Sequence, residues 1–334
     1  MAENSKIEWT DHTFNPFIGC TKVSPGCDHC YAEAMMDTRL GLTQWGPHGK
    51  RVRTSASNWR KPLRWNKAHA DFFAAHNRRQ RVFCASLADV FDNAVDPAWR
   101  RDLFNLIELT PNLDWLLLTK RIGNVMRLLP SHDWCAGRDN VWVGATIVNQ
   151  EEALRDVPKL MQVPARRRFL SVEPMLGPID LTDVNYTHSP GYFGDAFQWH
   201  HLPYCNRAER YPSIDWVICG GESGPGARPM HPSWPRALRD QCATAGVPFF
   251  YKQWGEWTDK DWGERPGYQD TAGVLPSGEF RLLSQGYVPP FDTHDRLVAA
   301  GNVRLDGRML MHRVGKENTG RLLDGRTHDE FPPV

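Results

Sequence analysis

Residues 114–121, DWLLLTKR, form a short apolar run that ends abruptly in two cations. Similar apolar runs recur along the chain, and each is followed by a polar cluster and then by a helical pattern. Runs that are apolar on both faces suit parallel strands covered by helices. We predict strands at residues 81–86, 114–119, 141–146, 168–172, 215–220 and 247–252, and a weakly marked one before Cys20.

Helical patterns separate these runs. They lie at residues 97–109 after an Asp96 cap, at 122–129, at 151–160, and at 234–245 between a Ser233 cap and Gly246. The repeated βα order predicts an α/β fold, namely a partial (β/α) barrel of about six or seven parallel strands. An open doubly wound sheet is the alternative.

Two stretches interrupt this order. Residues 181–213 lack periodicity and are rich in His, Tyr, Pro and Asn, which indicates an insertion or a lid. After Trp254 the chain becomes polar and Gly-rich. We therefore expect a barrel over residues 1–254, with that insertion, and a loop-rich extension over 255–334 packed on it.

The composition narrows the class of protein. The 334 residues carry a formal net charge of +1, so no chain-wide attraction to nucleic acid or to a membrane exists. The first residues lack a signal-peptide pattern, and no apolar run reaches membrane-spanning length, so we expect a cytoplasmic protein. The eight cysteines are better explained as thiols or metal ligands than as a disulfide framework. The oligomeric state is not indicated.

Cys20, Cys27 and Cys30 form a C-x6-C-x2-C cluster with a Pro25-Gly26 turn inside it. Three thiolates on one loop can hold three corners of a cubane iron–sulfur cluster and leave the fourth iron open to a ligand. A structural zinc site is the alternative and needs a fourth ligand, for which His12 and His29 are near in sequence. Unrelated thiols are the third interpretation.

Motifs along nearly the whole chain resemble the phage Gp37/Gp68 family, of the DUF5131 type. They are IEWTDHTFNPFIGCTKVSPGCDHCYAE (7–33), SLADVFD (86–92), LLLTKR (116–121), SVEPMLGPIDL (171–181), WVICGGESGPGARP (216–229), FYKQWGEW (250–257) and GRLLDGRTHDEFP (320–332). That family is similar to radical S-adenosylmethionine proteins. The resemblance implies a [4Fe–4S] cluster on the three cysteines, S-adenosyl-L-methionine as co-substrate, a 5′-deoxyadenosyl radical, and an external electron donor.

Polar residues follow the predicted strands at their carboxyl ends, which form the functional face of a parallel barrel. We predict that Asp89, Lys120, Glu173 and Lys252 line the substrate cavity as catalytic residues. Asp92, Arg121, Asn149, Gln150 and Gln253 stand at the same strand ends. Glu173 either binds ribose hydroxyls or pairs with one of the two lysines.

The triplet Gly220-Gly221-Glu222 and the following Ser223 resemble the segment that binds the methionine amino group in radical enzymes, and a tight turn is the alternative. His29 stands where such enzymes often carry an aromatic residue against the adenine; otherwise it is a loop histidine. We assign the other cysteines, including Cys205, no chemistry.

Residues 49–70 contain seven basic residues, two tryptophans and no acid, which suits binding to phosphates and unpaired bases. A solvated loop whose tryptophans cover the barrel is the alternative. Nucleic acid is thus a candidate substrate for modification or repair. Two rival functions are a zinc-stabilised, non-catalytic nucleic-acid-binding protein and a hydrolase or transferase that uses the polar rim without iron.

Overall fold

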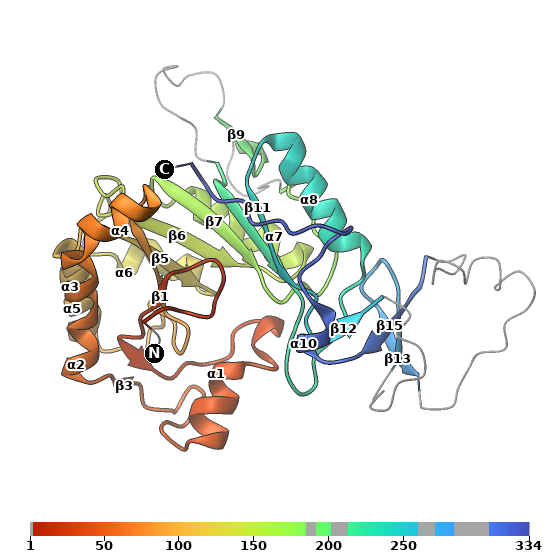
Figure 1. Cartoon of the computed structure of the whole chain (residues 1–334), viewed down its shortest axis with the longest axis horizontal. Coiled ribbons are helices and arrows are strands. Elements are labelled where there is room, and N and C mark those ends of the chain that lie inside the picture. The colour runs from red at the N-terminus through yellow and green to blue at the C-terminus, as the bar shows by residue number, and fades with distance from the viewer. Residues whose placement is uncertain (1–2, 185–191, 202–212, 260–270, 284–306, 334) are drawn as a thin grey trace, which may run out of the picture.

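Seven parallel strands form the central sheet of the computed structural model, which describes residues 3–184, 192–201, 213–259, 271–283 and 307–333 (Figure 1). They pair in chain order, without any reversal. The sheet curls into a half-barrel with helices around it, so the predicted partial (β/α) barrel is confirmed and the doubly wound alternative is wrong. The strands are β1 (His12–Thr13), β4 (Gln80–Cys84), β5 (Leu113–Thr119), β6 (Val141–Thr146), β7 (Arg167–Val172), β10 (Trp216–Gly220) and β11 (Phe249–Gln253).

The crossover helices lie close to their predicted positions. They are α5 (Pro97–Glu108), α6 (Val125–Leu128) after the 3-10 turn η3 (Ile122–Asn124), α7 (Gln150–Met161) and α8 (Ser233–Ala245). Asp96 caps α5 by accepting a hydrogen bond from the backbone N–H of Ala98, and Gly246 ends α8 in the left-handed conformation, both as predicted. The predicted Ser233 cap is wrong, because Ser233 is the first helical residue and its hydroxyl pairs with His231.

Most of the segment at residues 49–70, which we predicted as a basic strip or as a solvated loop whose tryptophans cover the barrel, folds into short helices, the last of which extends beyond it. These are α2 (Ala56–Trp59), α3 (Lys61–Lys67) and α4 (His69–His76). Ser55 caps the first of them, and Pro62 stands near the start of the second, where a missing N–H costs nothing. Trp65 is buried and stacks on His12, with ring centroids 4.1 Å apart. The segment therefore covers the first strands.

Aromatic side chains fill the inside of the half-barrel. Trp9, Trp142, Trp216 and Phe250 belong to one buried cluster on the concave face, while the larger apolar cluster on the other face packs under the helices. Gly144 stands in this layer because a Cβ there would approach the Phe169 ring to 2.4 Å. The lower half of the concave face is thus a packed apolar floor.

The remaining elements lie at the two ends of the chain and in the insertion. Near the N-terminus are the paired strands β2 (Phe17–Ile18) and β3 (Val52–Arg53), the turn η1 (Pro25–Cys27), and α1 (Tyr31–Glu33) with the π-helix η2 (Ala34–Arg39). The insertion contains the hairpin β8 (Tyr192–Asp195) and β9 (Gln198–His201). Near the C-terminus an antiparallel sheet has the order β12 (Trp257–Thr258), β15 (Met309–Arg313), β13 (Thr271–Val274) and β14 (Phe280–Leu283), and α10 (Lys316–Thr319) follows it in the chain. The domain boundary at residue 254 stays a prediction. No helix in the described part of the chain is both long and apolar enough to cross a membrane.

The C-terminal segment returns to the barrel and covers the free edge of β11. The backbone N–H of Tyr251 donates to His328, and Phe250 and Asp329 form an antiparallel bridge. The indole of Trp216 donates to the carbonyl of Glu330, and the Phe331 ring packs 5.2 Å from the Trp216 ring. A covered strand edge offers no template for pairing with another chain.

Trp216→Ala is expected to lower the free energy of unfolding by about 4 kcal/mol, because it opens a cavity in the fully buried aromatic floor. Phe73→Ala, on α4, where the ring is 42% exposed, is the control and should cost about 1 kcal/mol or less. Urea unfolding followed by circular dichroism measures both. Equal losses in the two variants would contradict a packed floor.

Candidate active site

A cavity of about 550 Å³ opens above the aromatic floor, at the carboxyl ends of the parallel strands. Side chains alternate between the two faces of a strand, so residues two positions beyond the floor point into the same space. Phe169 belongs to the floor, while Ser171 and Glu173 of the same run line the cavity, as Lys252 does two residues after Phe250. Along these strands, the residues on the inner face thus change from apolar to polar within two positions.

The segment that bears the three cysteines forms another wall of this cavity, and Cys20, Cys27 and Cys30 all line it. Ser24 caps the η1 turn by accepting a hydrogen bond from Gly26. Gly26 packs so closely that a Cβ there would lie 2.7 Å from Val148. The loop therefore sits directly against the barrel and carries its thiols on the cavity side.

The donor set suits a cluster that binds each thiolate to a different iron. Such a cluster needs its protein sulfurs to face one shared volume, whereas a single ion needs ligands that converge on one point. Within residues 3–184, 192–201, 213–259, 271–283 and 307–333, no three Cys, His, Asp or Glu side chains converge closely enough to hold one metal ion. Cys20, Cys27 and Cys30 all line one cavity, and three thiols are the protein donor set of a cluster that keeps one iron open.

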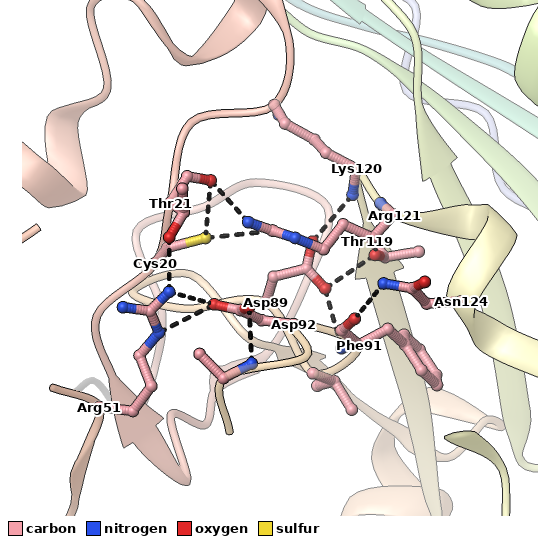
Figure 2. Close-up of polar contacts among 12 residues, drawn as sticks. Cys20, Thr21, Arg51, Asp89, Phe91, Asp92, Thr119, Lys120, Arg121 and Asn124 are labelled. Carbon is pink, nitrogen blue, oxygen red and sulfur yellow. Dashed lines mark hydrogen bonds and ion pairs between the residues drawn. The ribbon is translucent and has the colours of Figure 1, made fainter. Parts of the chain in front are cut away.

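Arg121 connects the first cysteine with the carboxylate of Asp89 (Figure 2). Its Nη1 lies 3.2 Å from Cys20 Sγ and 3.0 Å from Asp89 Oδ2, and its Nη2 donates to the carbonyl of Thr21 at 2.6 Å. Burial and the nearby Asp89 carboxylate raise the pKa of the Cys20 thiol and Arg121 opposes them, which leaves the pKa at about 11. The ionised thiolate that a metal requires is thus paired with a guanidinium.

Glu222 holds the cysteine loop through Arg228. The guanidinium and backbone N–H of Arg228 donate to the Glu222 carboxylate at 2.6–2.8 Å, and the same guanidinium reaches Asp28 Oδ2 at 3.0 Å and the carbonyl of Pro25 at 2.8 Å. His29 Nδ1 lies 3.2 Å from Glu222. Burial would raise the pKa of Glu222, but its hydrogen bonds with Arg228 and His29 lower it overall. Both carboxylate oxygens therefore already have partners.

Glu173 pairs with Lys252 across the cavity wall. The Lys252 Nζ lies 2.9 Å from Glu173 Oε1. Of the two lysines predicted as possible partners of Glu173, Lys252 is therefore the one that pairs with it. Burial would lower the pKa of Lys252, but Glu173 raises it above its ordinary value. Gly220 does not line the cavity; it leaves room for this pair, because a Cβ there would lie 2.9 Å from Glu173 Oε1.

Apart from Gly220, every predicted site residue lines the same cavity. These residues are Cys20, Cys27, His29, Cys30, Asp89, Lys120, Glu173, Gly221, Glu222, Ser223 and Lys252. Three other residues at strand ends do not line it: Asp92 pairs with Arg51, Asn149 caps α7, and Gln150 binds the backbone of Asp180.

Sequence reasoning missed two contributors to the site. The N-terminal residues Lys6, Ile7, Glu8 and Trp9 line the cavity; the last three open the motif at residues 7–33, but nothing in it assigned them to the site. Arg228 follows Glu222 by six residues, and the only signal was its place in a Gly-rich loop, which does not specify a partner. Cys84, Cys135, Cys219 and Cys242 are buried and burial raises their pKa, as suits thiols without chemistry, whereas Cys205 lies outside the described residues.

Three of the seven basic residues in the predicted strip form ion pairs within the chain. Arg51 is buried and forms an ion pair with Asp92. Arg53 pairs with Asp102 and lies 4.4 Å from the Trp59 ring centroid, and Arg64 pairs with Glu3. The guanidinium groups of these three arginines have carboxylate partners within the chain, and phosphate binding by the strip stays a prediction.

The fold and the site together define a partial (β/α) barrel protein with a thiol-bearing loop at the carboxyl ends of its strands. The chain belongs to the DUF5131 family, described as "Protein of unknown function (DUF5131)", whose model matches residues 4–332. This description carries no phage name, so the Gp37/Gp68 assignment stays a prediction. No curated protein matches the chain.

Three solved structures similar to this chain are mutants of spore photoproduct lyase. The first holds bound AdoMet and dinucleoside spore photoproduct; it is 16% identical, with a TM-score of 0.30, over 48% of this chain and 45% of its own. The second is 12% identical, with a TM-score of 0.35, over 79% of this chain and 68% of its own. The chain thus matches less than half the length of the first of these structures.

Glu222→Gln is expected to destabilise the protein at pH 7 and to have a smaller effect in acid. Because the folded protein lowers the pKa of Glu222, the ionised carboxylate stabilises the fold above its ordinary pKa of 4.5, and this stabilisation is lost as the pH falls through the lower folded value. Urea unfolding at pH 7 and at about pH 3.5 measures the difference from wild type.

The control for this experiment is Glu279→Gln, at an exposed position away from the cavity. It should match wild type at both pH values. A Glu222→Gln deficit that is equally large at both values would contradict the role of the ionised carboxylate in holding Arg228.

Proposed function

We propose that the protein is a radical S-adenosylmethionine enzyme in which Cys20, Cys27 and Cys30 hold a [4Fe–4S] cluster. The main support is that the three thiols line one cavity together with the polar strand ends of a parallel half-barrel. Active sites of (β/α) barrels lie at this face. When bound, the cluster supplies an electron to the sulfonium of S-adenosyl-L-methionine and so provides a 5′-deoxyadenosyl radical.

The residues of the chain contribute orientation and exclusion of water. Trp9, Phe83 and Leu118 close the cavity from below with apolar surface. Arg228 fixes the cysteine loop to Glu222, and Gly221, Glu222 and Ser223 border the cavity next to His29, so this side is our candidate cofactor side. A dry, rigid site keeps a reactive radical away from solvent.

Lys120, Glu173 and Lys252 are the candidate substrate-facing residues. Glu173 and Lys252 form an ion pair in the wall, so either can exchange this partner for a polar group of the substrate. Lys120 lines the cavity, and its ammonium group forms no ion pair in the described part of the chain, although its backbone N–H donates to Asp89. Asp89 serves this site by holding Arg121 rather than by meeting the substrate, since its oxygens accept hydrogen bonds from Thr119, Lys120, Phe91 and Arg121.

For the substrate, nucleic acid remains the proposal. Besides Lys120, the cavity is lined by Lys6 and Lys316 and by the exposed aromatic residue Tyr31. Cations favour phosphates, and aromatic rings offer stacking faces for unpaired bases. The proposal of a nucleic-acid substrate therefore rests on residues that line the cavity, and no longer on the basic strip at residues 49–70.

Anaerobic reconstitution with iron and sulfide is expected to yield about four iron atoms and as much sulfide per chain. Incubation with dithionite, as the external electron donor, and S-adenosyl-L-methionine should release 5′-deoxyadenosine. Cys20→Ala, Cys27→Ala and Cys30→Ala should each lose the cluster and the product. Iron and sulfide analysis and chromatography of the nucleoside measure both.

Cys135→Ala is the matched control, because Cys135 is buried and does not line the cavity. It should keep the cluster and the product. Colourless protein with about one zinc per chain would instead support the zinc-stabilised alternative. An intact cluster without 5′-deoxyadenosine, or activity that survives Cys20→Ala, would contradict the radical mechanism.

Expression of the wild-type protein is expected to change the nucleosides of host DNA or RNA, whereas expression of Cys20→Ala is not. The reason is that a radical formed in the cavity should react with the nucleic acid bound there, whereas the variant forms no radical. Mass spectrometry of digested DNA and RNA from both strains and from an empty-vector strain checks this. Identical nucleosides in all three would contradict a nucleic-acid substrate.

A further inference from the structure

Two buried ion pairs hold the residue next to the first cysteine. Arg121 donates to the carbonyl of Thr21 at 2.6 Å, and Arg51 donates to the Thr21 hydroxyl at 2.7 Å. Each arginine is backed by an aspartate from the segment after β4: Asp89 for Arg121 and Asp92 for Arg51 (Figure 2). Hydrogen bonds from two arginines therefore restrict the motion of Thr21.

Arg121 differs from Arg51 because it also contacts the sulfur. Its Nη1 lies 3.2 Å from Cys20 Sγ, whereas the hydrogen bonds of the Arg51 side chain to described residues go to Thr21, to the carbonyls of Gly46 and Gly49, and to Asp92. The side chains of Arg121 and Asp89 are 9% and 7% exposed, so water screens their charges weakly. The Arg121–Asp89 pair therefore acts on Cys20 at short range and in a poorly solvated environment.

The position of Asp89 is fixed independently of Arg121. Its Oδ1 accepts from the Thr119 hydroxyl at 2.7 Å and from the Phe91 backbone at 2.9 Å, and its Oδ2 accepts from the Lys120 backbone at 3.1 Å. The carboxylate thus remains in place even when the guanidinium is changed. The two charges can be removed one at a time.

Hydrogen bonds to the ligating sulfurs and nearby charges set the reduction potential of an iron–sulfur cluster. Reduction adds a negative charge, which a donor at the sulfur stabilises and a carboxylate close by destabilises. We propose that Arg121 is a positioning residue that fixes Cys20 and raises the reduction potential of the cluster bound there, while Asp89 limits this rise. This inference rests on the proposed function.

The midpoint potential of the reconstituted protein, followed by electron paramagnetic resonance during a dithionite titration, tests the inference. We expect a lower potential for Arg121→Gln, because the positive charge at the sulfur is lost. We expect a higher potential for Asp89→Asn, because Arg121 then acts without its counter-charge. Shifts of opposite sign from the two members of one ion pair are not produced by a general loss of structure.

Arg51→Gln is the matched control. It removes a buried arginine that holds the same Thr21, but it leaves the contact with the sulfur intact. We expect it to reduce the fraction of chains that hold a cluster and to shift the potential less than Arg121→Gln does. A potential shift as large as that of Arg121→Gln would overturn the role of the sulfur contact.

If Arg121→Gln does not fold, as judged by circular dichroism, Asp89→Asn decides alone, and a potential at or below that of wild type overturns the inference. A wild-type potential in fully loaded Arg121→Gln would also overturn it, without touching the proposed function. Wild-type protein that takes up no iron and sulfide would overturn the proposed function itself, and the inference with it.

Discussion

The parallel pairing of seven strands is the constraint on which the site depends. It brings the carboxyl ends of β4 to β11 to one rim, and the residues that follow these ends share one cavity although they are far apart in sequence. The aromatic cluster below them makes the inside of the half-barrel solid, so the cavity has a floor. The chemistry of the protein is thereby confined to the rim and to whatever segment covers it.

That covering segment is the cysteine loop, and buried charges hold it there. Arg121 and Arg51 grip Thr21, and Arg228 grips Pro25 and Asp28 from the other side. A buried charge is tolerated when it is paired and hydrogen-bonded, and removal of one partner leaves the other uncompensated. The loop is therefore coupled to the barrel next to Cys20 and next to Cys27.

The open sides of the half-barrel are closed by the two ends of the chain. Trp9 packs on Phe83 inside the half-barrel, with ring centroids 4.7 Å apart, beside β1, and the segment around Phe331 covers the edge of β11. Arg81 packs against the C-terminal segment and the floor, because its guanidinium lies 3.9 Å from the Phe331 ring centroid and 5.8 Å from that of Trp142. Burial lowers the pKa of Arg81 to about 10, in keeping with its place among aromatic rings.

The sequence by itself determined the strands, the crossover helices and the rim, because apolar runs and caps are local signals. It also marked the three cysteines by spacing and Asp89, Glu173, Glu222 and Lys252 by their place after strands. The tertiary structure alone decided the partners: Arg121 with Cys20, Arg228 with Glu222, and Arg51 with Asp92. Such pairs join residues 6 to 101 positions apart, and a sequence pattern does not encode which charges meet when distant segments are packed together.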